Sequence, residues 1–132
     1  MKILCVDYGV RNLGFATAET PFATPLSVAH VDSMGEAIIA TTKVVDQFHP
    51  DYIVVGIPEG EIATLVMAYV TALKPLFQAQ IVTHPETLSS QEAVIKLREA
   101  GASRAKFAKD HAFAACLILE DYLDANPNLV KI

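Results

Sequence analysis

The sequence predicts an α/β fold in which helices flank a mixed five-stranded sheet, with three antiparallel strands followed by two parallel strands. Two patterns support this class. Residues 1–31 contain short apolar runs separated by turn residues, whereas the rest alternates short apolar runs with segments of helical periodicity. The chain has 132 residues, 52% hydrophobic and 19% charged, which is enough to bury one core. We therefore expect a single domain over residues 1–132.

The first three predicted strands form an antiparallel meander. Ile3 to Val6 is an apolar run typical of a buried strand, and it gives way to a turn at Asp7. Leu13 to Ala18 is the second strand, so the two pair as a hairpin across residues 8–12. Pro25 to Val31 supplies the third strand.

The later elements alternate between helix and strand, which favours parallel pairing. Capping boxes open two of the predicted helices, at Ser33 with Glu36 and at Ser89 with Glu92. In chain order the predicted elements are a helix from Ser33 to Phe48, a strand Tyr52–Ile57, a helix Ile62–Leu73, a strand Ala79–Thr83, a helix from Ser89 to Gly101, and a helix from about Ser103 to Leu123. This order of elements is compatible with the ribonuclease H architecture.

Charge and composition exclude several classes of protein. The formal charge of −5 argues against a polybasic nucleic-acid wrapper. Cys5 and Cys116 lie within apolar runs and are predicted to be reduced core residues. No apolar run approaches the roughly 18 residues that span a membrane, and the run before Asp7 is too short for a signal peptide. We expect a cytoplasmic protein with no membrane partner.

Three acidic residues follow predicted strands. Asp7 follows the first strand, Glu59 the fourth and Glu86 the fifth. A carboxylate at the end of a buried strand costs desolvation free energy unless a partner offsets it, and a metal ion is one such partner. An Asx-type turn at Asp7, a solvated loop acid at Glu86, and a favourable helix N-terminus near Glu59 are the structural alternatives.

The last predicted helix places a histidine in the middle of its apolar face. At about 100° per residue, Ala114, Ile118 and Tyr122 share a stripe in which His111 is central, while Asp110 lies at the margin. His111 therefore points at the sheet. It is either a core histidine bonded to backbone or a metal ligand opposite an acid such as Asp7.

Basic residues are concentrated just before His111. Residues 96–109 carry a net charge of +4, from Lys96, Arg98, Arg104, Lys106 and Lys109 against Glu99, and the remaining residues carry −9. Contact with phosphates is one use for such a stretch, and a solvated helix–turn–helix is the alternative.

Four short motifs carry a resemblance to a known family. They are ILCVDYG at residues 3–9 with Arg11, Leu13 and Gly14 after it, VVGIP at 54–58, PETLSS at 85–90 with Ala93, and Ala114-Ala115 followed by Ile118-Leu119-Glu120. In this order and spacing they resemble the YqgF family, also called RuvX, of ribonuclease H-like nucleases. The resemblance covers nearly the whole chain.

The resemblance implies a metal-dependent nuclease that hydrolyses phosphodiester bonds with Mg²⁺ or Mn²⁺. Asp7, Glu86 and His111 would be the catalytic and metal-binding residues, and Arg11, Arg104, Lys106 and Lys109 would contact nucleic acid. The implied substrate is precursor small-subunit ribosomal RNA, with a Holliday junction as the alternative. The chain departs from the family pattern at Pro85 and His111, where the family has acids. Related resolvases of the RuvC type place a histidine in the corresponding helix, and they use a glutamate after the fourth strand, which keeps Glu59 as a rival or supplement to Glu86.

Two other classes remain open at this point. The segment from Asp7 to Gly14 also resembles the first phosphate loop of actin-like and sugar-kinase ATPases, although a chain of 132 residues supplies one lobe of such a protein at most. A non-catalytic RNA- or protein-binding domain on the same fold is the third reading, because the family's acid is missing at His111. ATP binding, or RNA binding without metal-dependent cleavage, would favour these alternatives.

Overall fold

The computed structural model describes residues 1–9, 11–19, 22–86 and 110–128. Its strands are β1 (Ile3–Tyr8), β2 (Asn12–Ala18), β3 (Thr24–His30), β4 (Tyr52–Ile57) and β5 (Gln80–Pro85), and its helices are α1 (Met34–Phe48), α2 (Ile62–Leu73) and α5 (Asp110–Ala125). The predicted helix over residues 89–101, and the start of the predicted last helix at residues 103–109, lie outside the described residues.

The strands form one mixed sheet in the order β3-β2-β1-β4-β5. β1 pairs antiparallel with β2 and β2 pairs antiparallel with β3, whereas β1–β4 and β4–β5 are parallel. The predicted α/β architecture, three antiparallel strands and then two parallel ones, is therefore confirmed. β1 is the central strand. Because β1, β4 and β5 are parallel, their carboxyl ends lie side by side at the same end of the sheet.

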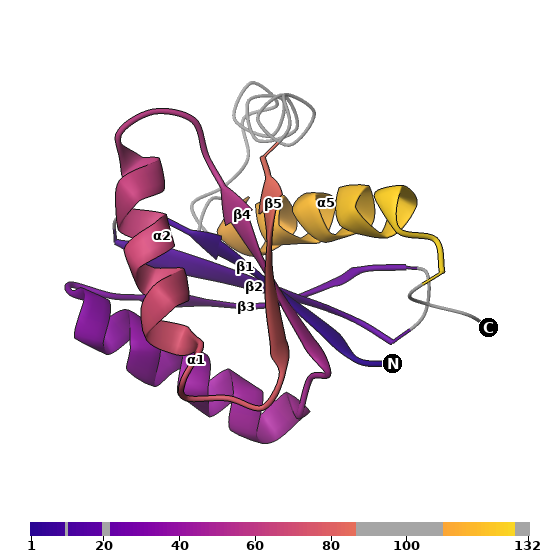
Figure 1. The fold of residues 1–132 in the computed structure, drawn as a ribbon, viewed down its shortest axis with the longest axis horizontal. Coiled ribbons are helices and arrows are strands. Elements are labelled where there is room, and N and C mark those ends of the chain that lie inside the picture. The colour runs from indigo at the N-terminus through magenta and orange to yellow at the C-terminus, as the bar shows by residue number, and fades with distance from the viewer. Residues whose placement is uncertain (10, 20–21, 87–109, 129–132) are drawn as a thin grey trace.

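Two helical layers cover the sheet (Figure 1). α1 and α2 pack on one face over a core that includes Leu4 and Val6 of β1, and α5 packs on the other face over Ile3 and Cys5. Because side chains alternate along a strand, the even residues of β1 pack into the core under α1 and α2, and the odd residues pack into the core under α5. Cys5 of β1 and Cys116 of α5 are free and buried in this second core, as predicted.

The predicted capping box at the start of α1 is present with one difference. The Ser33 hydroxyl accepts a hydrogen bond from the backbone N–H of Glu36 at 3.2 Å, but the Glu36 carboxylate accepts from the N–H of Asp32 at 2.9 Å rather than from that of Ser33. Both bonds satisfy backbone donors at the helix start. In the described part of the chain, no helix has the length and apolar character needed to cross a membrane.

Two strands are longer than predicted, and both differences bear on the site. β1 continues through Asp7 to Tyr8, and β5 continues through His84 to Pro85. Polar residues and a proline suggested earlier ends. A strand can include Pro85 because β5 is an edge strand, where a missing backbone N–H need not break a ladder.

Candidate active site

Asp7 lies in the central strand between two glycines. It pairs with Gly14 of β2 on one side and with Gly56 of β4 on the other. Its side chain shares the α5 face with Ile3 and Cys5 and is 14% exposed. The prediction that a turn begins at Asp7 is therefore wrong, because both neighbouring strands pair with this residue. Since neither cross-strand neighbour has a side chain, other groups can approach Asp7 closely from both sides.

Gly14 brings the start of α5 down onto the sheet. A Cβ atom at Gly14 would overlap the backbone carbonyl group of His111 and lie 2.8 Å from the backbone nitrogen of Ala112. Only glycine allows this approach of helix to strand. The first turn of α5 is consequently held directly beside Asp7.

Gly56 makes room for Glu86. A Cβ atom at Gly56 would lie 3.3 Å from Cγ and 3.4 Å from Oε1 of Glu86, so the Glu86 carboxyl group extends over β4. The backbone N–H of Glu86 donates to the carbonyl of Ile57 at 2.9 Å, which extends the β4–β5 ladder by one bond. Strand pairing therefore fixes the backbone of Glu86 so that its side chain extends across β4 toward Asp7.

The two carboxyl groups interact directly. Burial, the charge of Asp7 and a side-chain hydrogen bond with Asp7 together raise the pKa of Glu86 to about 8. Two carboxylates this close cannot both ionise at low cost, so the folded protein keeps the proton of Glu86 to a higher pH than an exposed glutamate does. A nearby cation would favour the loss of this proton.

His111 lies beside the same pair. Its Nδ1 is 3.8 Å from Oδ2 of Asp7, and its side chain is 37% exposed. Its ring also lies against the β1–β2 turn, since a Cβ atom at Gly9 would be 3.5 Å from its Cε1. The helical pattern predicted that His111 faces the sheet, and the structure places it there. The side chain of Asp110 lies outside the described residues.

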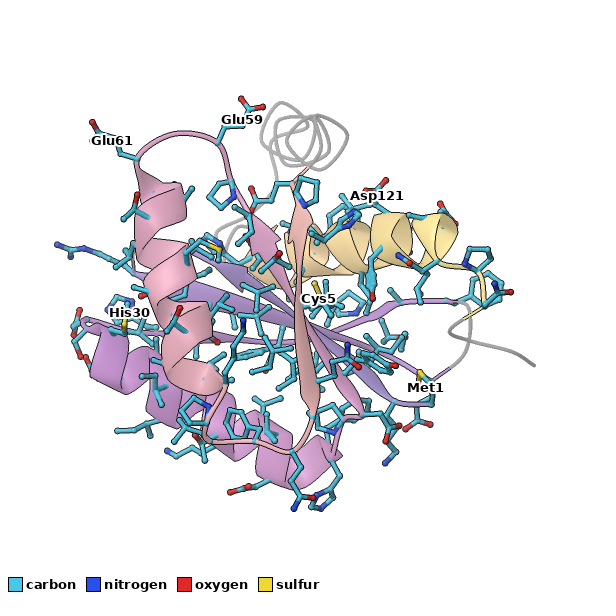
Figure 2. The ribbon with its side chains drawn as sticks, in the orientation of Figure 1. Met1, Cys5, His30, Glu59, Glu61 and Asp121 are labelled. Atoms are coloured by element: carbon cyan, nitrogen blue, oxygen red, sulfur yellow. The ribbon has the colours of Figure 1, made fainter. Side chains whose placement is uncertain are left out.

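The other predicted site residues are placed differently. Glu59 is exposed on the loop between β4 and α2, and Figure 2 shows its side chain pointing outward. Arg11 is exposed in the β1–β2 turn, close in sequence to Asp7, and its carbonyl accepts from the N–H of Val31 at 2.8 Å. Arg104, Lys106 and Lys109 lie outside the described residues.

The donor set suits a divalent cation. Mg²⁺ is usually held by one or two carboxylates together with waters and substrate phosphates rather than by a complete protein cage. Asp7 and Glu86 supply two such carboxylates, and their mutual repulsion is what a cation would relieve. Among the described residues, no group of three or more His, Cys, Asp or Glu side chains is gathered at metal-binding spacing. His111, with its Nδ1 3.8 Å from Asp7, is the candidate for a third donor.

The raised pKa of Glu86 predicts how stability depends on pH in the metal-free protein. From the ordinary value of 4.5 up to about 8, the folded protein keeps a proton that the unfolded chain has lost. The contribution of Glu86 to the free energy of unfolding is therefore fully present below pH 4.5 and is lost as the pH rises toward 8. After solvent screening of this partly exposed pair, the loss is roughly 1–2 kcal/mol. Urea unfolding at several pH values in EDTA measures it, and Glu86→Gln should remove this part of the slope.

Sequence patterns missed part of this site. The pairing of Gly56 with Asp7 is a property of strand register, which local sequence patterns do not show. A second polar pair on the α5 face, His84 and Asp121, is joined by a 2.6 Å hydrogen bond. No spacing rule connects these two residues, and on the helical wheel Asp121 sits at the margin of the apolar stripe.

A mixed five-stranded sheet with an acidic pair at the carboxyl ends of β1 and β5 defines a ribonuclease H-like protein. The similarity to known structures agrees. RuvC from Thermus thermophilus, solved with a Holliday junction, matches with a TM-score of 0.66 and 16% identity over 99% of this chain and 98% of that one. The fowlpox virus resolvase, also solved with Holliday junction DNA, matches with a TM-score of 0.56 and 13% identity over 93% and 99%.

The chain belongs to the RuvX family, whose model is described as Holliday junction resolvase and matches residues 1–125. A relative from Dechloromonas aromatica is 31% identical over 97% of this chain and 94% of its own length. A relative from Francisella tularensis subsp. novicida is 25% identical over 95% and 98%. Both carry the name "Putative pre-16S rRNA nuclease". The predicted family is confirmed, and with it the predicted class of nuclease.

Proposed function

We propose that this protein is a metal-dependent nuclease that cleaves precursor small-subunit ribosomal RNA in the cytoplasm. The observation that carries the proposal is the contact between Asp7 and Glu86, two carboxyl groups brought together at the carboxyl ends of β1 and β5. The names of the relatives support the substrate class. Such a pair has little structural use, because it costs folding free energy unless a cation compensates it.

The residues of the site take separate roles in this proposal. Asp7, fixed in the central strand, would anchor the ion, and Glu86 would hold the ion and position the attacking water. His111 is either a third ligand or the group that protonates the leaving oxygen. Mg²⁺ or Mn²⁺, when bound, supplies charge stabilisation for the attacking and leaving oxygens. Arg11 in the adjacent turn, together with Arg104, Lys106 and Lys109, would contact phosphates.

The direct test uses labelled nucleic acids. Precursor small-subunit ribosomal RNA is incubated with the protein in Mg²⁺, in Mn²⁺ and in EDTA, and the products are mapped. Cleavage at defined positions that requires a divalent ion is the expected result. RNA binding without cleavage in either metal would contradict the proposal and favour a non-catalytic binding domain.

A four-way DNA junction is the second candidate substrate. The description of the family model and the fold shared with RuvC support it. The same incubation with a labelled junction compares the two substrates. Symmetric cleavage of the junction, with the precursor RNA left intact, would assign the protein to DNA.

His111→Asp tests the histidine at the site. It restores the family's acid beside Asp7, so we expect equal or higher nuclease activity and a preference shifted from Mn²⁺ toward Mg²⁺, which favours oxygen ligands. Without metal the variant should melt at a lower temperature, because a further acid then faces Asp7. Thermal melts with and without Mg²⁺ measure both effects.

His111→Asn is the control for this variant, since it changes the size similarly and adds no charge. Mg²⁺ should raise the melting temperature of His111→Asp more than that of His111→Asn, because only the first variant adds a carboxylate to those of Asp7 and Glu86. If Mg²⁺ raises the melting temperature of His111→Asp no more than that of His111→Asn, His111 is not at the metal site, and a structural histidine is the better description.

A further inference from the structure

A hydrogen-bonded pair joins β5 to α5 next to the proposed metal site. His84 Nε2 lies 2.6 Å from Asp121 Oδ2, and the His84 ring stacks on Tyr122 with centroids 5.5 Å apart and planes 23° from parallel. The His84 side chain is 15% exposed and that of Asp121 is 42% exposed. Figure 2 shows Asp121 on α5 beside the end of β5. Because an ionised Asp only accepts, Nε2 carries the proton and donates.

Glu86 directly follows β5, two residues after His84, and its N–H continues the ladder to Ile57, so both side chains extend from the α5 face. Gly56 shows this arrangement directly. It pairs with His84 in the ladder, and both Glu86 and Ile118 of α5 border the space where its side chain would be. Any shift of His84 along or away from the sheet would therefore move Glu86 as well.

This end of β5 needs a restraint. β5 is an edge strand with β4 as its neighbour on one side, and Glu86 follows its last residue, where a single backbone bond to Ile57 continues the ladder. α5 packs chiefly over β2 and β1, away from the β5 edge. Asp121 nevertheless reaches across to His84, and the stacking on Tyr122 fixes the plane of the ring. Two contacts from one helix thus hold the strand end.

We propose that Asp121 and His84 are positioning residues that hold Glu86 in place for the divalent ion. The inference rests on the proposed function, because it concerns the ligand geometry of the same site. Residues that orient a metal ligand typically change metal affinity or activity by about 10–100-fold when they are removed. The pair would act before any substrate binds.

The test compares Asp121→Ala with Asp121→Asn. Alanine removes the bond in a helix that tolerates it, whereas the Asn oxygen can still accept from His84. We expect Asp121→Ala to weaken Mn²⁺ binding about 10–100-fold, measured by titration without substrate, and to lower kcat with the KM for RNA unchanged. It should also speed hydrogen exchange of the Glu86 amide, which bonds to Ile57 at the strand end. Asp121→Asn should restore wild-type behaviour.

Two further variants serve as controls. Asp124→Ala removes an exposed acid from the same helix and should leave all three measurements unchanged. His84→Phe keeps a ring against Tyr122 but loses the bond, so it should match Asp121→Ala. Unchanged metal affinity and amide exchange in Asp121→Ala, beside normal cleavage by the wild type, would overturn the positioning role alone. A wild type that binds no Mn²⁺ and cleaves neither nucleic acid would overturn the proposed function, while the amide exchange would still report the restraint.

Discussion

Asp7→Asn is expected to abolish metal-dependent cleavage while the protein remains folded. The amide keeps the shape of the side chain but removes the charge at the centre of the site. Loss of several kcal/mol of charge stabilisation corresponds to a fall in rate of about 10³-fold or more. The variant should be at least as stable as the wild type without metal, because the charge that raises the pKa of Glu86 is gone. Cleavage assays and melts in EDTA measure the two effects.

The opposite changes in activity and stability make this prediction specific. If Asp7 were purely structural, its substitution would lower the free energy of unfolding, and the activity of the protein would fall only in proportion to the folded fraction. Asp46→Asn is the matched control, since Asp46 is an exposed acid on α1, on the other face of the sheet. Full activity in folded Asp7→Asn would remove Asp7 from the site.

Gly14→Ala is expected to have the largest effect on stability. Alanine normally suits a strand interior better than glycine, by roughly 0.5–1 kcal/mol. At Gly14 the added methyl group would overlap the carbonyl of His111, and backbone atoms cannot swing aside as a side-chain end can. Either α5 lifts from the sheet or the strand shifts, and such overpacking costs about 3 kcal/mol or more. Urea unfolding followed by circular dichroism measures the loss.

Gly35→Ala provides the contrast. A Cβ atom at Gly35 in α1 would meet only the Ser33 hydroxyl, at an ordinary contact distance of 3.7 Å. Alanine there should stabilise the protein by about 0.5–1 kcal/mol, because it favours the helix. Equal effects of the two substitutions would mean that α5 does not rest on β2 at Gly14.

The sheet was predictable because each strand carries its own signal. Runs such as Tyr52–Ile57 are apolar and bounded by turn residues, and the switch to alternating helices implied parallel pairing. The strand ends were not predictable in the same way. Asp7 and His84 are polar, and local pattern assigns polar residues to turns, whereas pairing with neighbouring strands keeps both within the sheet. Register is a long-range property that composition does not carry.

The site was predictable to a similar depth. Position after a strand and helical periodicity selected Asp7, Glu86 and His111 as candidates, and the structure places Glu86 and His111 each beside Asp7. The same reasoning predicts Glu59 as a candidate metal ligand, but its side chain is exposed on the loop after β4. The bond between His84 and Asp121 had no signal, because one residue ends an edge strand and the other lies on a helix far along the chain. Their contact depends on how α5 crosses the sheet.

The centre of the site is assembled from opposite ends of the chain. Asp7 belongs to the first strand to be synthesised, Glu86 to the fifth, and His111 to α5, which docks on β1 and β2. Domains generally fold as whole units during synthesis. A nascent chain that lacks α5 would leave Ile3 and Cys5 uncovered and Asp7 without its neighbours from the helix. The order of the elements therefore predicts that the proposed site, with His111 beside Asp7, is complete only after α5 has been synthesised.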